Sequence, residues 1–308
     1  MPMNRSSRIY IAGHTGLVGS ALCRLLQRRG YRRILTRTSA QVDLTDQKAV
    51  HRFFLQYRPE FVFLVAAKTG GILANRTKPV DFISINVAIQ NAVMAAAHRY
   101  GVKKFIFTAC SCIYPKHCPQ PMKPIHLFSG KVEPTNEAFS IAKMAGLVTG
   151  QSYARQYKAP FVTAILNTVY GPNDRVDPDG SHFLPAVIQK IHYATKTKQP
   201  EVVLWGTGKP RRELIHSDDV ARALLVVMQK YHALEPINIG SGKDYSIRQI
   251  AEIVRRVTGY SGKIVYDTTK PDGMPRKLLD AEPIFSLGWK PRTPLQKGIQ
   301  EWYHSATF

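Results

Sequence analysis

The 308 residues are enough for one large domain, or for a large domain and a smaller one, with a substantial hydrophobic core. Hydrophobic residues (44%) and charged residues (21%) occur at the levels typical of soluble globular proteins. The net charge of +22 is spread along the chain, with no basic block longer than short pairs such as Arg28-Arg29. Nucleic-acid binding is therefore not expected, and most of this charge is interpreted as solvated surface.

Composition also bears on membranes, metals and location. No apolar stretch is expected to reach the length of a membrane-spanning helix, and residues 1–7 lack the apolar core of a signal peptide. A cytoplasmic protein without a membrane partner is predicted. The four cysteines show no Cys-x-x-Cys spacing and no matching His cluster: Cys23, Cys110, Cys112 and Cys118. Neither a metal site nor a disulfide framework is expected.

Strands and helices are predicted to alternate along the first half of the chain. The expected strands are short apolar runs at 8–12, 34–36, 61–65, 104–108 and 161–166. The expected helices end near 29, run from a cap at Asp46 to about 57, and span 79–100 and 137–157. This alternation is typical of an α/β fold, here a doubly wound parallel (Rossmann) sheet. Ligands of such a sheet bind at the carboxyl ends of its strands.

The regular alternation of strands and helices ends after Gly171-Pro172, where loops rich in Pro and Gly begin. A helix is predicted from about His182, a strand at 202–204, a helix capped by Asp218, and a strand at 237–240 that returns to the main sheet. We predict a dinucleotide-binding domain at 1–170, with 206–240 partly returning to it. Residues 171–308 are predicted to form a smaller, discontinuous α/β substrate-binding region.

Three glycines between the first strand and the first helix indicate a phosphate loop. Gly13, Gly16 and Gly19 have the spacing that permits a tight turn and a close backbone approach to a pyrophosphate at the helix N-terminus. After the second strand the chain has Arg37 and no acid until Asp43. A base at this point favours NADP(H) over NAD, because it can pair with the additional phosphate.

The chain resembles the extended short-chain dehydrogenase/reductase family and, within it, the GDP-L-fucose synthase subfamily. The matching segments run in family order along nearly the whole chain and include Glu133-Pro134-Thr135-Asn136-Glu137. The more specific ones contain Cys112-Ile113-Tyr114-Pro115 and Lys270-Pro271-Asp272-Gly273. The resemblance implies a GDP-keto-sugar substrate, GDP-4-keto-6-deoxymannose, which is epimerised at carbons 3 and 5 and then reduced at carbon 4 with NADPH. By position, Asp43 would contact the adenine, and Ala66 and Ala67 would line the cofactor.

The resemblance also assigns roles to chemically active side chains. Cys112 and His182 match the acid/base pair of the epimerisation, in which one group removes a proton and the other delivers one to the opposite face. Lys143 matches the lysine that holds the nicotinamide ribose. Four positions match residues that contact the GDP-sugar: Lys190, Trp205, Arg212 and Lys277. Family members commonly form homodimers through the helices expected at 79–100 and 137–157.

Three substitutions fall in the reductive site. The tyrosine that protonates the ketone oxygen in the family is replaced by Phe139, and the serine position holds Cys110. The asparagine of a later Asn-x-Tyr-Gly-Pro segment stands one place early, at Asn167. Four interpretations stay open: a slow reductase that uses water or Cys110 as donor, an epimerase that leaves reduction to a partner, a related GDP-sugar enzyme with different chemistry, and a non-catalytic nucleotide-binding relative.

Overall fold

Six parallel strands form the main sheet of the computed structural model, which describes residues 3–174, 183–270 and 272–306. Across the sheet the strands are β2 (Arg33–Leu35), β1 (Arg8–Ala12), β3 (Phe61–Leu64), β4 (Lys104–Cys110), β5 (Phe161–Leu166) and β9 (Ile237–Ile239). The strand order reverses direction beside β1, which places the crevice for a ligand at the carboxyl ends of β1 and β3.

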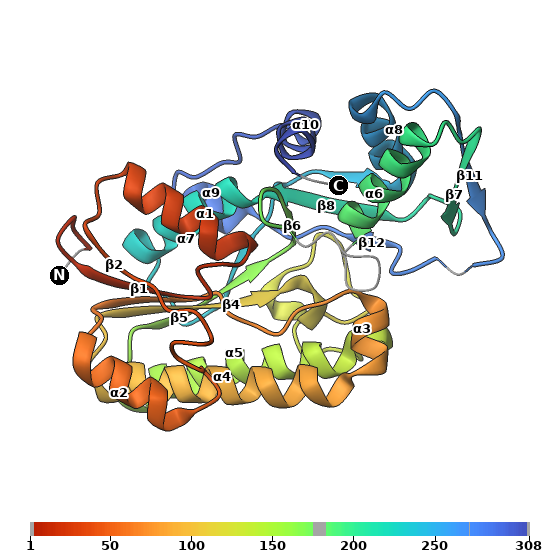
Figure 1. Cartoon of the computed structure of the whole chain (residues 1–308). Coiled ribbons are helices and arrows are strands. Elements are labelled where there is room, and N and C mark those ends of the chain that lie inside the picture. Colours follow the sequence, from red (N-terminus) through yellow and green to blue (C-terminus); the bar gives the residue numbers. More distant parts are fainter. Residues whose placement is uncertain (1–2, 175–182, 271, 307–308) are drawn as a thin grey trace.

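Helices cover both faces of this sheet (Figure 1). One face carries α1 (Leu17–Arg28), α7 (Ser217–Lys230) and α9 (Glu282–Ser286), and the other carries α2 (Gln47–Tyr57), α4 (Pro79–Arg99) and α5 (Glu137–Tyr157). The inner strands are apolar on both faces because each face is buried in its own core, as the continuous run of β3 illustrates. The predicted doubly wound α/β class is confirmed.

Two of the helix starts show how capping decides a boundary. The predicted cap at Asp46 is confirmed, since its carboxylate accepts a hydrogen bond from the Lys48 amide at 2.8 Å. The predicted cap at Asp218 is wrong. The Nδ1 of His216 accepts from the Asp218 amide at 3.2 Å, and Asp218 lies in the first turn, where its charge faces the helix dipole.

Helix α4 corrects the expectation about apolar length. Its 21 residues, with a mean hydropathy of 1.4 over an 18-residue window, are long and apolar enough to cross a membrane by length and composition alone. In the structure α4 packs along the main sheet beside α5, with Phe82, Ile89 and Val93 in the core (Figure 1). A core helix has the same composition, so the criterion does not separate the two cases.

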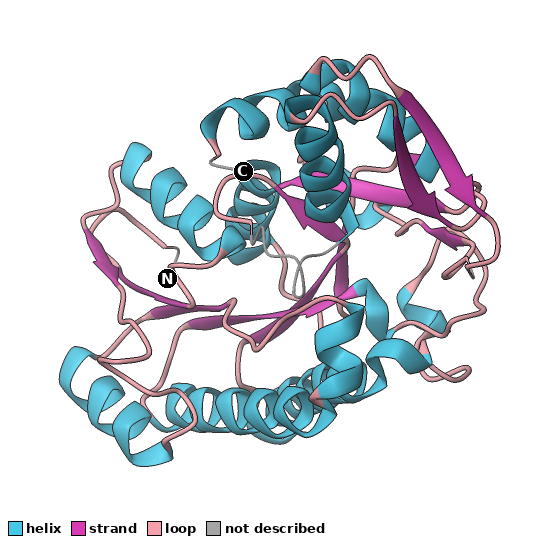
Figure 2. Ribbon diagram, turned by 45° about the vertical axis from the view of Figure 1, so that its right-hand side comes forward, coloured by secondary structure: helices cyan, strands magenta, loops and turns pink. Residues whose placement is uncertain are grey.

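The smaller region is built on the central strand β8 (Arg211–His216), with β6 (Thr168–Tyr170) and β12 (Arg276–Lys277) parallel to it and β10 (Asp244–Ser246) antiparallel. A second, two-stranded sheet pairs β7 (Glu201–Trp205) with β11 (Lys263–Asp267). Helices α6 (Phe183–Lys196), α8 (Ile247–Thr258) and α10 (Leu295–Ser305) enclose a third core with these strands (Figure 2). A short helix, α3 (Ile72–Thr77), precedes α4 in the main domain.

The chain crosses between the two regions several times. After β8 it enters α7, which packs against α1 on the main sheet, and then β9, which pairs with β5. It then returns to β10 beside β8 and comes back once more to α9, which packs against β9.

Candidate active site

The glycine loop after β1 lies against the end of β3. Gly13 has φ +95°, and a Cβ there would lie 2.7 Å from backbone atoms of Ala66. Gly16 is the N-cap residue of α1 and makes no side-chain cap, while Gly19 packs against the Gly13 carbonyl, where a side chain would clash. The first-turn amides of α1 are thus free of side-chain caps and exposed to an anion. The loop fits a pyrophosphate, with Ala66 and Ala67 beyond the end of β3.

The loop between β2 and α2 holds the two residues that sequence reasoning tied to cofactor choice. The Arg37 guanidinium lies 4.5 Å from the Tyr57 ring centroid and donates to the Thr36 carbonyl at 2.6 Å, so part of its donor fork stays available. Asp43 is exposed, and hydrogen bonds from the Thr45 amide and hydroxyl hold its pKa below the usual range. In this structure Asp43 closes a turn.

A pair of thiols stands at the carboxyl end of β4, one buried (Cys112) and one partly buried (Cys110). Cys110 is its last residue and Cys112 lies in the 3₁₀ turn Ser111–Ile113 that follows. A hydrogen bond from the Cys110 thiol lowers the pKa of Cys112 to about 7, against the effect of burial and with help from the charge of Lys277 and the hydroxyl of Ser140. The same hydrogen bond, together with burial, raises the pKa of Cys110. Cys112 is therefore the member of the pair that ionises first.

Lys143 is buried beneath this turn. Its Nζ donates to the Thr108 carbonyl at 3.0 Å and lies 4.8 Å from the Phe107 ring centroid and 6.0 Å from that of Phe139. Burial lowers the pKa of Lys143, and the two neighbouring thiols oppose that effect. Phe139 stands one helical turn before Lys143 and packs edge-on against Phe82. The tyrosine position is thus an apolar ring beside an ammonium group.

Two cations of the smaller region lie on adjacent strands, and one of them acts on Cys112. Arg212 on β8 and Lys277 on β12 are register partners on adjacent strands. The Arg212 guanidinium donates to the Met274 carbonyl at 2.6 Å, and the charge of Lys277 reaches Cys112. The structure therefore places these two predicted substrate ligands side by side, with Lys277 near Cys112. A pair of cations on neighbouring strands suits a diphosphate.

The other two predicted substrate ligands lie at β7, in the two-stranded sheet. Trp205 at the end of β7 is 70% exposed. The Lys190 ammonium on α6 donates to the Val203 carbonyl of the same strand at 2.9 Å. The carboxylate of Asp272 accepts hydrogen bonds from Thr207, just after Trp205, and so ties the loop before β12 to this strand.

One predicted site residue is not described by the structure, and two buried polar residues had not been predicted. His182 lies outside the described residues, next to the first residue of α6. Sequence reasoning assigned no functional role to Ser140, which is buried beside Cys112, or to Glu213, a fully buried carboxylate on β8 that lies in a segment matching the family. A charged residue next to the apolar pair Leu214-Ile215 was the available signal for Glu213. Among the described residues, no group of three His, Cys, Asp or Glu side chains is arranged to hold a metal ion.

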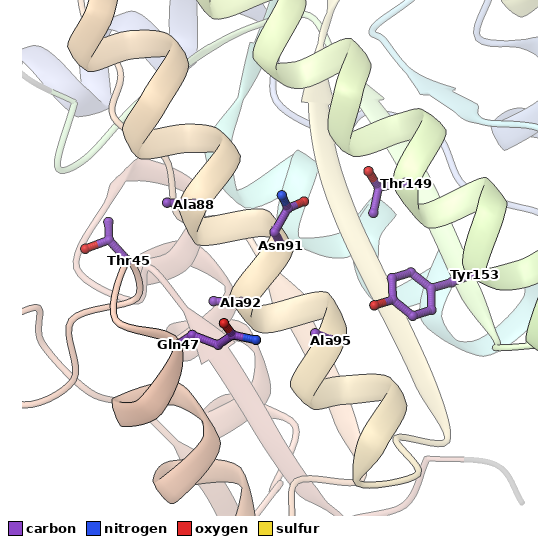
Figure 3. Close-up of a pocket in the computed structure, with 8 residues that line it drawn as sticks. All are labelled: Thr45, Gln47, Ala88, Asn91, Ala92, Ala95, Thr149 and Tyr153. Atoms are coloured by element: carbon purple, nitrogen blue, oxygen red, sulfur yellow. The ribbon is translucent and has the colours of Figure 1, made fainter.

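A separate hollow of about 360 Å³ lies away from the thiols, among α2, α4 and α5. Figure 3 shows its lining: small side chains of α4, together with Thr45 and Gln47 on one side and Thr149 and Tyr153 of α5 on the other. No chemically active group that the sequence analysis selected lines it.

The fold and the glycine loop define a dinucleotide-binding enzyme of the Rossmann class. Residues 9–240 match the NAD dependent epimerase/dehydratase family, and the chain belongs to that family. It is similar to GDP-L-fucose synthase 1 of Arabidopsis thaliana, with 46% identity over 97% of this chain and 93% of that one. It is also 44% identical to GDP-L-fucose synthase of Escherichia coli, over 96% and 95% of the two chains.

Solved structures of GDP-sugar reductases share the fold of this chain over nearly its full length. A GDP-mannoheptose C4 reductase from Campylobacter jejuni, with NADP bound, superposes with a TM-score of 0.90 at 38% identity over 98% of both chains. A GDP-6-OMe-4-keto-L-xylo-heptose reductase from the same organism superposes with a TM-score of 0.93 at 36% identity over 99% of both chains. The resemblance seen in the sequence is confirmed at the level of family and fold.

Proposed function

We propose that this protein is an NADP(H)-dependent GDP-sugar epimerase/reductase that acts on GDP-4-keto-6-deoxymannose or a close analogue. The observation that carries the proposal is the thiol pair at the end of β4, close to the buried Lys143 and to Lys277, whose register partner on β8 is Arg212. Full-length similarity to GDP-L-fucose synthases supports the substrate class. The glycine loop and Arg37 support NADP(H) as the cofactor.

The epimerisation uses the acidity of the sugar. The protons on carbons 3 and 5 flank the ketone, so a base of moderate strength can remove them. In this proposal the Cys112 thiolate takes a proton, and His182 returns one to the opposite face. The charges of Lys277 and Lys143 favour the thiolate. Arg212 and Lys277 hold the diphosphate, and Trp205 and Lys190 contact the nucleotide end.

The reductive half rests on fewer groups. Bound NADPH supplies a hydride to carbon 4 of the sugar, and the ketone oxygen then needs a proton. Lys143 holds the ribose in this proposal, but Phe139 has no proton to give. The Cys110 thiol, which stays protonated because of its raised pKa, occupies the serine position and is the available side-chain donor. The substitution at Phe139 favours a second candidate function, an epimerase that does not reduce its product.

One incubation separates these functions. The protein is mixed with GDP-4-keto-6-deoxymannose and NADPH in deuterated water, and the products are analysed by mass spectrometry. Deuterium at carbon 3 or 5 together with NADPH consumption supports the full reaction. Deuterium without NADPH consumption supports the second candidate. NADPH binding with neither refutes both and indicates a non-catalytic relative. The substitutions Cys112→Ser and His182→Ala should each abolish deuterium uptake.

We also propose a homodimer formed through α4 and α5. The outer faces of these helices expose Val80, Ile141 and Val148, and the hollow among α2, α4 and α5 has the small side chains that close helix packing needs. A second copy related by twofold symmetry would bring four helices together. Replacing Ala95 in the hollow with Glu should convert the dimer to a monomer in sedimentation experiments. Leu55→Glu, an exposed position on α2, is the matched control.

Location and domain roles complete the proposal. We place the protein in the cytoplasm, where the Cys110 and Cys112 thiols stay reduced. Residues 1–170, joined by part of 206–240, bind the cofactor, and 171–308 bind the sugar nucleotide. Cell fractionation with an antibody tests the location. Hydrogen exchange measured with NADPH alone and with GDP alone tests the division of roles.

A further inference from the structure

A buried polar network begins between the two thiols. The Ser111 hydroxyl donates to Asn167 Oδ1 at 3.1 Å, and the Thr168 amide donates to the same oxygen at 3.0 Å. These two donors fix which way the Asn167 amide points. Ser111 and Asn167 are both buried, so the hydrogen bond between them is sheltered from water. The turn that carries Cys112 is thereby tied to the end of β5.

The other end of Asn167 meets Glu213. Asn167 Nδ2 donates to Oε2 of this carboxylate, which also accepts from the Leu279 amide at 2.9 Å. Oε1 accepts from the Gly242 amide at 2.7 Å and from the Ser241 hydroxyl at 3.4 Å. Four donors converge on a side chain with 0% exposure. Burial raises the pKa of Glu213, and these hydrogen bonds oppose that effect.

A carboxylate fits this position better than its amide. Each oxygen faces a backbone N–H group, from Leu279 on one side and from Gly242 on the other. A glutamine turned either way would direct its NH₂ group at one of these donors. An acceptor with two oxygens is therefore required, and a buried carboxylate is retained only where its hydrogen bonds are complete.

The network ends next to the substrate cations. Leu279 follows β12, and Lys277 in that strand is the register partner of Arg212 in β8, next to Glu213. The same segment is held a second time, because the Met122 amide donates to the Leu278 carbonyl at 2.7 Å. The Glu213 carboxylate therefore contacts the segment that directly follows the strand of Lys277. Through Asn167 it is also connected to the turn that carries Cys112.

We propose that Glu213 and Asn167 are positioning residues, which hold the Cys112 turn in a fixed relation to the strand that binds the sugar nucleotide. The proposal rests on the function proposed above. Asn167 and Ser111 set the position of the thiol. Glu213 sets that position together with the position of Lys277. The early asparagine in the sequence thus has a role: its amide spans the gap between β8 and the catalytic turn.

The test separates chemistry from binding. In Ser111→Ala and Asn167→Leu the link to the turn is lost while Leu279 stays bound to Glu213. We expect kcat for deuterium uptake to fall by about 10²-fold, as for a misplaced catalytic group, with substrate KM nearly unchanged. Glu213→Gln should lower kcat and also raise KM, because it disturbs the Lys277 strand as well. Ile165→Val, a buried change in β5 outside the network, is the control for a general loss of stability.

A second readout needs no substrate. The rate at which iodoacetamide alkylates Cys112 at pH 7 is measured by peptide mass mapping, with Cys23 on α1 as internal reference. Ser111→Ala and Asn167→Leu should change this rate severalfold, and Ile165→Val should not. If the wild-type protein takes up no deuterium, the proposed function fails, and the alkylation rates alone decide the positioning role. Unchanged kcat and alkylation in both variants, or equal changes in the control, would overturn it.

Discussion

Restoring the missing acid is the sharpest perturbation of the reductive site. Phe139→Tyr places a phenol one helical turn from Lys143, whose Nζ lies 6.0 Å from the present ring centroid. The ammonium stabilises the phenolate and so lowers the phenol pKa toward the working range. If proton delivery limits reduction, a positioned general acid should raise the rate by about 10²–10⁴-fold. That corresponds to about 2.7–5.5 kcal/mol of barrier.

The assay follows NADPH absorbance with the keto-sugar at saturation, and deuterium uptake is measured in parallel. Uptake should stay within about twofold of wild type, because Phe139 plays no part in removing the carbon-bound protons in this reasoning. Adding Cys110→Ser to Phe139→Tyr should raise reduction further by restoring the serine. A gain below about threefold in both variants would refute the idea that the acid limits reduction.

Three further changes follow from the geometry. Cys110→Ala removes the hydrogen bond that contributes most to the lowered pKa of Cys112, so the pH midpoint of Cys112 alkylation should rise from about 7; an unchanged midpoint would contradict the thiol coupling. Deuterium uptake, which needs the thiolate, should shift to higher pH with it. Arg37→Ala should weaken NADPH binding by about 10–100-fold while leaving NADH nearly unaffected, as measured by fluorescence titration; equal losses for both would exclude a phosphate contact. The buried carboxylate of Asp219 pairs with Arg222 and accepts hydrogen bonds from two backbone amides at 2.8 and 3.0 Å. Asp219→Ala leaves these groups without their partner, so urea unfolding should show a loss of about 3–5 kcal/mol in the free energy of unfolding. A loss below 1 kcal/mol would mean that water replaces these contacts.

Local patterns predicted much of the main domain. The limits of α5 and β5 were predicted to the residue. The strand is an apolar run without Gly or Pro, the helix has a long helical pattern, and each ends at a clear polar boundary. The glycine loop was readable because its chemistry is contained in one segment. The cap of α7 was missed because Ser217, Asp218 and Asp219 all suit that position, and the choice fell to His216 through its ring nitrogen.

Contacts between segments far apart in the sequence could not be predicted. The pairing of β8 with three other strands joins segments that are far apart in the sequence, and no local pattern specifies it. In the site, too, local segments could be interpreted from the sequence and long-range contacts could not. Cys112 and Lys143 could be selected because their segments resemble family motifs. The hydrogen bond between Asn167 and Glu213 spans 46 residues and depends on the folded arrangement of both sheets. Long-range hydrogen bonds of this kind become visible only in three dimensions.

The repeated crossing of the chain between its two sheets has a consequence for how the molecule folds. A fragment that stopped at residue 170 would lack β9 and α7, leaving β5 as an open edge and the apolar side chains of α1 without their partner helix. The main sheet is therefore completed only after the first strands of the smaller region have been synthesised. A cut at residue 170 would therefore not divide the chain into two intact units.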